Sequence, residues 1–458
     1  MSTSDIIWLL VQVIGSLALF LFGMKYMSEA LQRFAGQGMR NVLASFTSNR
    51  FKSILTGAFV TTVIQSSSAT TVMVVSFVNA GILKLRNAIG VIMGANIGTT
   101  MTAWIITLFG LKFDISAFAI PVIGAGFICM MLNKIKINQV GEFLVGFGIL
   151  FLGLTFLKNT ISDLDLQNSE AVRNIIAACV SDGNAHIGHV LLFLLIGTIL
   201  TTILQSSSAT MALTIVLCSE GVIPLELAVA LVLGENIGTT ITANIAAAIG
   251  NSTAKRAARA HLLFNTIGVL WILVVFRLVM PFINFLTISI EGVSPYVSAA
   301  AVPVALSLFH TLFNIMNTSI LVWFVPQIEK LTSLMVQGSN EEDEVEYRLK
   351  YINTGFMNVG EVSIELAKKE IGEFAKRMVR MYNFIPDLMK MKQNSKEYKP
   401  LLSRVQHYEE ISDRMEIEIA DYLDKIRSES ISGDSSLRMR GMLRIVDNLE
   451  SIDRKSVV

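Results

Sequence analysis

The hydrophobic residues of this 458-residue chain gather in long runs. A run of about 20 residues can cross a bilayer as a helix. Six runs of this kind lie near residues 6 to 31, 85 to 109, 114 to 132, 138 to 158, 258 to 289 and 298 to 326. Two more, near 53 to 82 and 189 to 222, carry a polar Gln-Ser-Ser-Ser block at their centres. The pattern predicts an all-α membrane protein with two interrupted segments.

Composition agrees with a membrane location over most of the length. Hydrophobic residues make up 52% of the chain and charged residues only 16%, against about 25% charged residues in soluble domains. Residues 1–5 carry no basic side chain, so we expect the first run to be a retained anchor and not a cleaved signal. The three cysteines, Cys129, Cys179 and Cys218, predict no disulfide framework. A net charge of +1 is uninformative about nucleic acid, and we expect no nucleic-acid partner.

The two interrupted segments are copies of each other. The decapeptide Thr61–Thr70 returns as Thr201–Thr210, displaced by 140 positions. A second block keeps the same offset, because Gly94–Thr100 returns as Gly234–Thr240. Leu-Phe-Gly-Met at 21–24 also resembles Phe-Leu-Gly-Leu at 151–154. We predict two repeats of span, interrupted segment, span and span, at about 1–135 and 136–290, followed by an extra span at about 298–328 in a membrane domain of residues 1–330.

Charge near the two copies predicts that the repeats are inverted. Basic residues border the first interrupted segment at Arg50, Lys52, Lys84 and Arg86. The second has no Lys or Arg nearby and carries Glu220 and Glu226 instead. Since basic loops stay in the cytoplasm, equivalent parts of the two repeats should face opposite sides. Re-entrant hairpins give this result with seven crossings, which is the architecture of inverted-repeat secondary transporters.

The serine blocks have the chemistry of an anion site. Irregular backbone at membrane depth is tolerated where it lines a cavity inside the protein. Serine is a favoured helix N-cap, so we expect helices to start from Ala69 and Ala209 with free N–H groups at each break. Helix N-termini and hydroxyl donors bind anions. Near the midplane, two such ends would surround one tetrahedral oxyanion with the hydroxyls of Ser66, Ser67, Ser206 and Ser207.

The glycine blocks have the chemistry of a cation site. Two glycines four residues apart are expected to loosen a helix, which frees carbonyl oxygens beside the amide and hydroxyl oxygens of the block. Such oxygens suit a hard cation such as sodium. Taken alone, each motif is more typical of close helix packing. Packing does not explain why both motifs recur together at one offset.

Three polar residues of the predicted membrane domain have open roles. His261 and His310 each stand four residues before an asparagine, Asn265 and Asn314, and hydrogen bonds between helices are the favoured explanation. Glu235 replaces Ala95 of the first copy. An acid inside a membrane span is a candidate functional group, as a cation ligand, a proton site, or a partner of His261 or His310.

At these motifs the chain strongly resembles the sodium-dependent phosphate cotransporter family, the type II symporters and their bacterial relatives, over about residues 1 to 330. The resemblance implies inorganic phosphate as substrate and co-transported sodium, with no other cofactor or metal and no enzymatic activity. The phosphate ligands that it implies are Ser66, Ser67, Ser68, Ser206, Ser207 and Ser208. The sodium ligands that it implies are Gln65, Gln205, Asn96, Thr99, Thr100, Asn236, Thr239 and Thr240. Glu235, His261 and His310 are accessory candidates.

From residue 337 onward a charged region begins, with Glu341–Glu344 at its start. Apolar residues at helical spacing, such as Leu366, Phe374 and Met378, predict a cytoplasmic helical bundle over 337–458. Residues 360–381 resemble the PhoU regulatory family, and the last helix is expected to be truncated. Asp447, Glu450 and Asp453 resemble its metal motif with an altered spacing, and we favour a solvated charged face there.

The leading hypothesis is therefore a sodium-coupled phosphate symporter in the inner (plasma) membrane, working by alternating access. An uncoupled anion channel and a phosphate sensor stay open, as does assembly into homo-oligomers. A membrane-embedded serine hydrolase is less favoured, since the chain has no Gly-x-Ser-x-Gly elbow.

Overall fold

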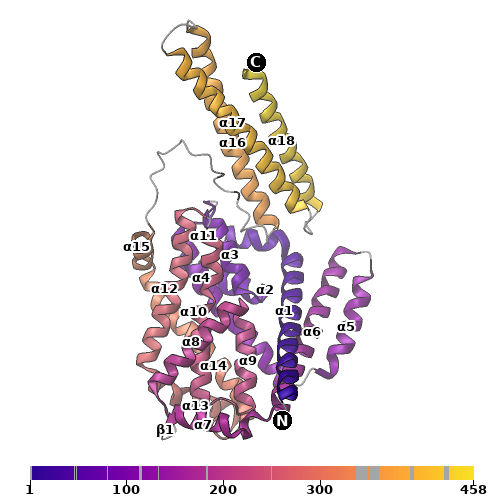
Figure 1. Cartoon of the computed structure of the whole chain (residues 1–458), viewed down its shortest axis with the longest axis vertical. Helices are drawn as coiled ribbons and strands as arrows, with labels where there is room; N and C mark the ends of the chain where they lie inside the picture. The colour runs from indigo at the N-terminus through magenta and orange to yellow at the C-terminus, as the bar shows by residue number, and fades with distance from the viewer. Residues whose placement is uncertain are drawn as a thin grey trace. The chain divides into compact units, whose positions relative to one another are not determined.

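The computed structural model shows an α-helical protein (Figure 1). It describes residues 3–45, 47, 49–79, 81–112, 116–132, 134–181, 184–248, 250–336, 349, 352, 360–391, 397–427 and 433–457. The acidic stretch at 341–344 and the start of the predicted tail at 337 lie outside these residues. Two compact units are present, one formed mainly by residues up to 335 and the other mainly by the C-terminal helices.

The first half of unit 1 follows the order span, broken helix, span. Its helices are α1 (Thr3–Ser45), α2 (Arg50–Ile64), α3 (Ser67–Asn79), α4 (Leu85–Ile105), the π-helix η1 (Ile106–Lys112) and α5 (Ser116–Met130). The run at 114 to 132 thus forms a helix of 15 residues, about 22 Å long. It is shorter than the candidate membrane spans among the described residues.

The next part begins with a long helix, a short linking segment and a second broken helix. Its elements are α6 (Ile135–Asp163), η2 (Leu166–Asn168), α7 (Glu170–Cys179), β1 (Val180–Ser181), β2 (Asn184–Ala185), α8 (Ile187–Leu204), α9 (Ser207–Ser219), α10 (Leu225–Gly238) and α11 (Thr240–Ala248). The two strands pair antiparallel through Val180 with Ala185 and Ser181 with Asn184. This small hairpin is an addition to the expected all-α pattern.

Residues 252–335 follow, and unit 1 includes them from Arg256 onward. They form α12 (Ser252–Val274), α13 (Phe276–Glu291), η3 (Ala299–Ala301), α14 (Val302–Leu321), η4 (Val322–Phe324) and α15 (Val325–Met335). The expected single span at 258–289 is wrong, because the helix breaks at Val275. An unbroken helix of that length would measure about 48 Å, far more than the hydrocarbon thickness of about 30 Å.

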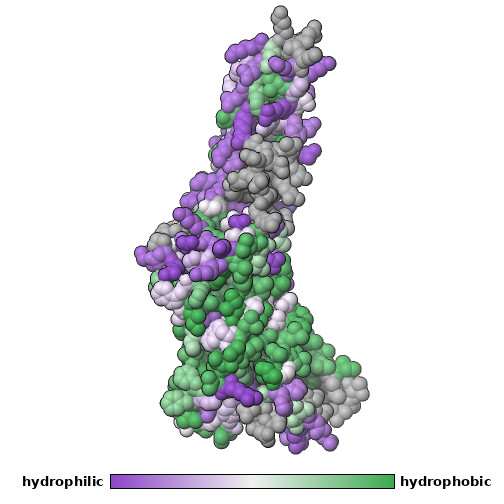
Figure 2. Space-filling view, turned by 90° about the vertical axis from the view of Figure 1, so that its left-hand side faces the viewer, coloured by the Kyte–Doolittle hydropathy of each residue, from purple (hydrophilic) through white to green (hydrophobic). Residues whose placement is uncertain are grey.

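Seven helical segments among the described residues are long and apolar enough to cross a membrane. They are Ile7–Ala35, Leu85–Lys112, Ile135–Asn168, Ile187–Leu204, Leu225–Ala248, Ser252–Val274 and Ala299–Met335. Large hydrophobic side chains cover much of the face of unit 1 seen in Figure 2. The protein is therefore an all-α multi-pass membrane protein. The number of segments equals the expected seven crossings, but α8 is among them and α5 is not.

Helices α1 and α6 lie side by side and contact each other through glycines (Figure 1). A Cβ atom built on Gly23 would lie 2.3 Å from the backbone nitrogen of Leu150. One built on Gly153 would lie 2.3 Å from that of Phe20, and one on Gly146 would lie 2.5 Å from that of Met27. Because residue numbers rise along one helix as they fall along the other, the two helices are antiparallel. Gly23 and Gly153 are the matching glycines of the 21–24 and 151–154 sequences.

Within unit 2, the C-terminal helices pack as a bundle (Figure 1). They are α16 (Gly360–Lys390), α17 (Tyr398–Arg427) and α18 (Gly433–Val457). Phe374, Met415 and Leu423 are buried in its core, and the predicted core residues Leu366 and Met378 are buried as well. Asp447 is exposed on α18, as a solvated charged face requires.

Candidate functional site

The chain breaks its helix at the first serine block. Gln65 ends α2 in the left-handed conformation, at φ 58° and ψ 29°, and its N–H donates to the carbonyl oxygen of Thr61 at 2.8 Å. Helix α3 then begins at Ser67. The hydroxyl of Ser66 accepts a hydrogen bond from the N–H of Ala69 at 3.2 Å, as an N-cap residue does. The helix therefore starts two residues earlier than expected from the sequence.

The second serine block repeats this geometry. Gln205 ends α8 at φ 50° and ψ 26°, and α9 begins at Ser207. Ser206 is the N-cap, and its hydroxyl accepts from the N–H of Ala209 at 3.3 Å. Since non-glycine residues seldom take this left-handed backbone, its presence at both glutamines is a property of the repeated motif.

A pair of threonines holds the two arms of each break together. In the first copy Thr61 Oγ1 donates to Thr70 Oγ1 at 3.0 Å. In the second copy Thr201 Oγ1 donates to Thr210 Oγ1 at 2.9 Å. All four side chains are buried. The hydrogen bond joins the end of one helix to the start of the next, which fixes the position of the N–H groups between them.

The two glycine blocks differ in whether they loosen their helices as expected. Helix α4 runs unbroken through Gly94 and Gly98, whereas α10 ends at Gly238 and α11 begins at Thr240. In both blocks the first glycine permits close approach, because a Cβ on Gly94 would lie 1.9 Å from the carbonyl oxygen of Ile54 on α2. A Cβ atom built on Gly234 would lie at the same distance from the carbonyl oxygen of Leu194 on α8. Each glycine block thus binds its helix tightly to the first arm of its own serine block.

The predicted sodium ligands of the two glycine blocks are buried. Hydroxyls of Thr99, Thr100, Thr239 and Thr240 each donate to a carbonyl oxygen three or four residues earlier in the chain. A hydroxyl that donates its hydrogen keeps lone pairs that a cation can use. Asn96 Nδ2 donates to Asn265 Oδ1 of α12 at 3.2 Å, whereas Asn236 Nδ2 donates to Val232 O within α10.

The accessory candidates are buried without partners for several polar atoms. Oε2 of Glu235, both ring nitrogens of His261 and Nδ1 of His310 have no hydrogen-bond partner among the residues that the structure describes. Asn265 and Asn314 each donate to the carbonyl oxygen of the histidine one turn before, His261 and His310. Within the same described part of the chain, no hydrogen bond or ion pair joins Glu235 to either histidine. Buried polar atoms without protein partners call for water or an ion.

Two threonines that bond residues of the serine blocks escaped the sequence interpretation. Thr102 Oγ1 donates to Gln65 Oε1 at 3.0 Å, and Thr242 Oγ1 forms a 3.4 Å hydrogen bond with Ser68 Oγ. Each stands two residues after the Gly-x-Asn-Ile-Gly-Thr-Thr block, again 140 positions apart. They can be found from the sequence by extending the comparison of the two copies past Thr100 and Thr240.

The structure brings each serine block to the other copy's glycine helix or its extension. The Ser68–Thr242 hydrogen bond joins α3 to α11, while α9 packs against α4. The extra helix α14 packs against α4, α9 and α10. No hydrogen bond joins the serines of one block to those of the other among the described residues. The two copies therefore meet through crossed contacts between serine and glycine blocks.

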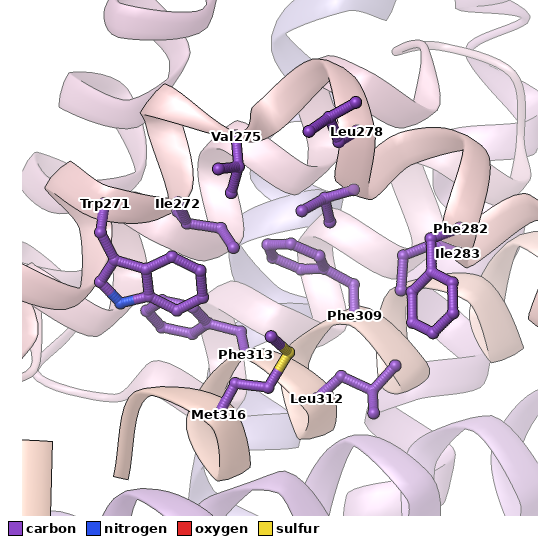
Figure 3. A pocket seen from close by; sticks show the side chains of 11 residues that line it. Trp271, Ile272, Val275, Leu278, Phe282, Ile283, Phe309, Leu312, Phe313 and Met316 are labelled. Atoms are coloured by element: carbon purple, nitrogen blue, oxygen red, sulfur yellow. The ribbon is translucent and has the colours of Figure 1, made fainter. Parts of the chain in front are cut away.

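An apolar cavity of about 190 Å³ lies between α12, α13 and α14. Figure 3 shows the side chains that line it, among them Trp271, Phe309, Phe313 and Met316. None of the lining side chains carries a charge or belongs to a repeated block. An anion would leave its water shell there without replacement donors, so this cavity is not the anion site.

Known proteins resemble this chain over the segments that carry the serine and glycine blocks. A family model described as Na+/Pi-cotransporter matches residues 19–159 and 167–294. The uncharacterized protein YqeW of Bacillus subtilis is 31% identical over 328 residues, which are 72% of this chain and 98% of that protein. The putative inorganic phosphate export protein YjbB of Escherichia coli is 25% identical over 443 residues, or 96% of this chain and 75% of that one.

A shorter match reaches a vertebrate relative. Sodium-dependent phosphate transport protein 2B of Homo sapiens is 40% identical over 103 residues, which are 22% of this chain and 15% of that protein. No solved structure matches the chain.

Proposed function

The chain belongs to the Na+/Pi-cotransporter family, a family of transporters and not of enzymes, and from that premise we propose that it carries inorganic phosphate across its membrane together with sodium. One observation carries the proposal. Two serine-capped helix starts, at Ser66 and Ser206, share one backbone geometry at a constant offset. Such a pair supplies anion donors twice without a buried Lys or Arg.

Phosphate would be held by the starts of α3 and α9. Both helices are 13 residues long, and the N-terminus of a helix carries about half a positive charge. Ser67 and Ser207 are buried at these starts, and their hydroxyls can donate to phosphate oxygens. A site of neutral donors releases its anion more readily than one with a paired cation, which suits a transporter that must let its substrate go.

Sodium would be held by the oxygen-rich surroundings of the glycine blocks. The proposed ligands are Gln65 and Gln205 with the asparagine and threonine oxygens of the blocks, namely Asn96, Thr99, Thr100, Asn236, Thr239 and Thr240. Their side chains are buried except for Gln205. Oxygen ligands of this kind suit a hard cation, and its charge would offset that of the phosphate. This is the physical basis that we propose for coupling.

The contact between α1 and α6 supports an inverted repeat. Gly23 meets Leu150 as Gly153 meets Phe20, so the two matching helices contact each other reciprocally. Two equivalent antiparallel helices in reciprocal contact are related by a two-fold axis perpendicular to both. For helices that cross a membrane, that axis lies in the membrane plane, as in transporters with inverted repeats. Alternating access of the two halves around one shared site is the mechanism we propose.

The flanking charges orient the protein. Arg50, Lys52, Lys84 and Arg86 would face the cytoplasm, and the C-terminal bundle would lie on that side of the inner (plasma) membrane. Among the relatives, one is named a putative phosphate exporter and another a sodium-dependent phosphate transport protein. We propose sodium-coupled symport whose net direction follows the combined gradients.

The test is uptake of labelled phosphate into proteoliposomes that hold the purified protein. We expect accumulation under an inward sodium gradient, and none when potassium replaces sodium or when only a proton gradient is present. Equal uptake in potassium would contradict the proposed sodium coupling and would favour an uncoupled channel. Phosphate binding without any uptake would favour a sensor, and would remove the transport proposal.

Matched variants test the proposed site. Ser67→Ala and Ser207→Ala should each lower uptake at limiting phosphate by about fivefold, as expected for the loss of one hydrogen bond. Ser289→Ala is the control, since Ser289 is exposed and bonds only a carbonyl of its own helix. Normal uptake in both site variants would show that the phosphate lies elsewhere.

A further inference from the structure

Thr102 and Thr242 occupy equivalent positions but bond different partners. The hydroxyl of Thr102 donates to the side chain of Gln65, which belongs to the serine block of its own copy. Among the described residues, Thr242 forms no hydrogen bond with Gln205, the equivalent glutamine. Its hydroxyl donates to the carbonyl oxygen of Thr239 at 3.0 Å and forms a longer, 3.4 Å hydrogen bond with Ser68 in the serine block of the other copy. The repeat symmetry is therefore broken at these two hydroxyls.

The two glutamines differ in the same sense. Gln65 is 8% exposed, whereas Gln205 is exposed. Their backbones have nearly the same left-handed conformation, and both are followed by the same five residues, Ser-Ser-Ser-Ala-Thr. Local sequence does not explain the difference. It lies in what surrounds each block. The side chain of Gln65 accepts from Thr102 and donates to the carbonyl oxygen of Thr62, and of these two contacts the bond from Thr102 comes from outside the serine block.

We propose that Thr102 and Thr242 are positioning residues that exchange partners during the transport cycle. In the state described here, Thr102 holds Gln65 in place while Thr242 contacts Ser68. In the opposite state, Thr242 holds Gln205 and Thr102 contacts Ser208. The inference rests on the proposed function, since it treats the two copies as halves of one transport site.

The exchange gives each half a physical link to the other. A threonine hydroxyl has one hydrogen, so it cannot donate to its own copy's glutamine while that hydrogen is given to another acceptor. In the state described here Thr242 donates to the carbonyl oxygen of Thr239. Burial of Gln65 and contact of Thr242 with Ser68 thus belong to one state. A symmetric pair of such states prevents both glutamines from being held by their threonines together, which is the condition that alternating access requires.

Hydrogen–deuterium exchange on the full-length protein in nanodiscs tests this without a transport assay. The two readouts are peptides covering residues 58–68 and 198–208. In the wild type, the first should exchange more slowly than the second. Thr102→Val removes the hydroxyl and keeps the shape. It loses the 3.0 Å bond to Gln65 in this state and, in the opposite state, only a serine contact whose counterpart here is the longer 3.4 Å Thr242–Ser68 bond. It should therefore speed exchange in the first peptide and slow it in the second. The expected change in the population ratio is at most about fivefold, the effect of one full hydrogen bond.

Two further variants make the test specific. Thr102→Ser keeps the hydroxyl and should leave both peptides as in the wild type. The double variant Thr102→Val with Thr242→Val loses one glutamine bond in each state and should return both peptides toward wild-type exchange. A purely structural role predicts the reverse, namely that damage from the two substitutions adds.

The outcome separates the inference from the proposed function. If Thr102→Val speeds exchange only in the first peptide, the asymmetry is permanent and the inference is wrong even where phosphate uptake is normal. If the exchange is reciprocal but the wild type takes up no phosphate, the two states are real and the substrate assignment is wrong.

Discussion

Ser28 Oγ donates a 2.7 Å hydrogen bond to the carbonyl oxygen of Ile64, the last residue of α2. The break at Gln65 leaves carbonyl groups at the end of α2 without their usual helical partners. A side chain of α1 thus satisfies a group that the first serine block exposes. The position 130 residues later, which corresponds to Ser28, holds Lys158.

Ser28→Ala should destabilise the protein by about 1–3 kcal/mol, because a buried carbonyl oxygen loses its donor. Thermal unfolding in detergent, followed by intrinsic fluorescence, measures the change. Ser16→Ala on the same helix is the matched control and should have a smaller effect. Equal melting temperatures for Ser28→Ala and the wild type would show that water replaces the serine.

Gly94→Ala should disrupt unit 1 strongly. The added methyl group would lie 1.9 Å from the carbonyl oxygen of Ile54, so α2 and α4 must separate. Overpacking of this kind costs about 1–3 kcal/mol and sometimes more. We expect a lower yield of monodisperse protein and a lower melting temperature on size-exclusion and unfolding assays. Gly124→Ala, where nothing lies within 4 Å, should behave as the wild type.

Asn96 and Asn265 should be energetically coupled. Their side chains are buried and joined by a 3.2 Å hydrogen bond between α4 and α12. A double-mutant cycle of Asn96→Ala and Asn265→Ala should give an interaction of about 1 kcal/mol in unfolding free energy. A cycle of Asn96→Ala with Ser289→Ala should be additive. If the first cycle were additive as well, the hydrogen bond between Asn96 and Asn265 would not stabilise the protein.

Tyr296 should make stability sensitive to high pH. It lies in the turn after α13, and partial burial raises its pKa, as do the charge of Glu226 and the hydrogen bond to it. Folding therefore favours the neutral phenol. Its contribution is complete below pH about 10, the ordinary value, and is lost as the pH rises above it. Tyr296→Phe should flatten the fall in melting temperature between pH 9 and 11, and an unchanged slope would contradict the assignment.

Helix breaks were predictable because they depend on near neighbours. Gln-Ser-Ser-Ser in an apolar run marked both breaks, but the caps are Ser66 and Ser206, so each following helix starts two residues before the expected Ala69 or Ala209. The apolar run at 258–289 misled for a related reason. Hydropathy alone does not register that such a run exceeds the membrane thickness, and the structure divides it at Val275.

The role of the glycine blocks was not predictable, because it depends on a partner helix. A glycine such as Gly94 can either loosen its own helix or let a neighbouring helix approach closely, and both roles require the absence of a side chain. The structure shows the second role, because the carbonyl oxygen of Ile54 lies against Gly94. Thr102 and Thr242 were missed because a single threonine in an apolar helix has no local signature.

The sequence by itself determined the membrane character, the duplication and the places where the helices break, because each depends on residues that are adjacent or equally spaced along the chain. Tertiary structure decided which segments of one copy contact which segments of the other. It joined Ser68 to Thr242 across the copies, and it left Gln65 buried and Gln205 exposed. Two nearly identical sequences differ there because burial and hydrogen bonding come from helices distant in the chain, and repetition in sequence does not require the same surroundings in space.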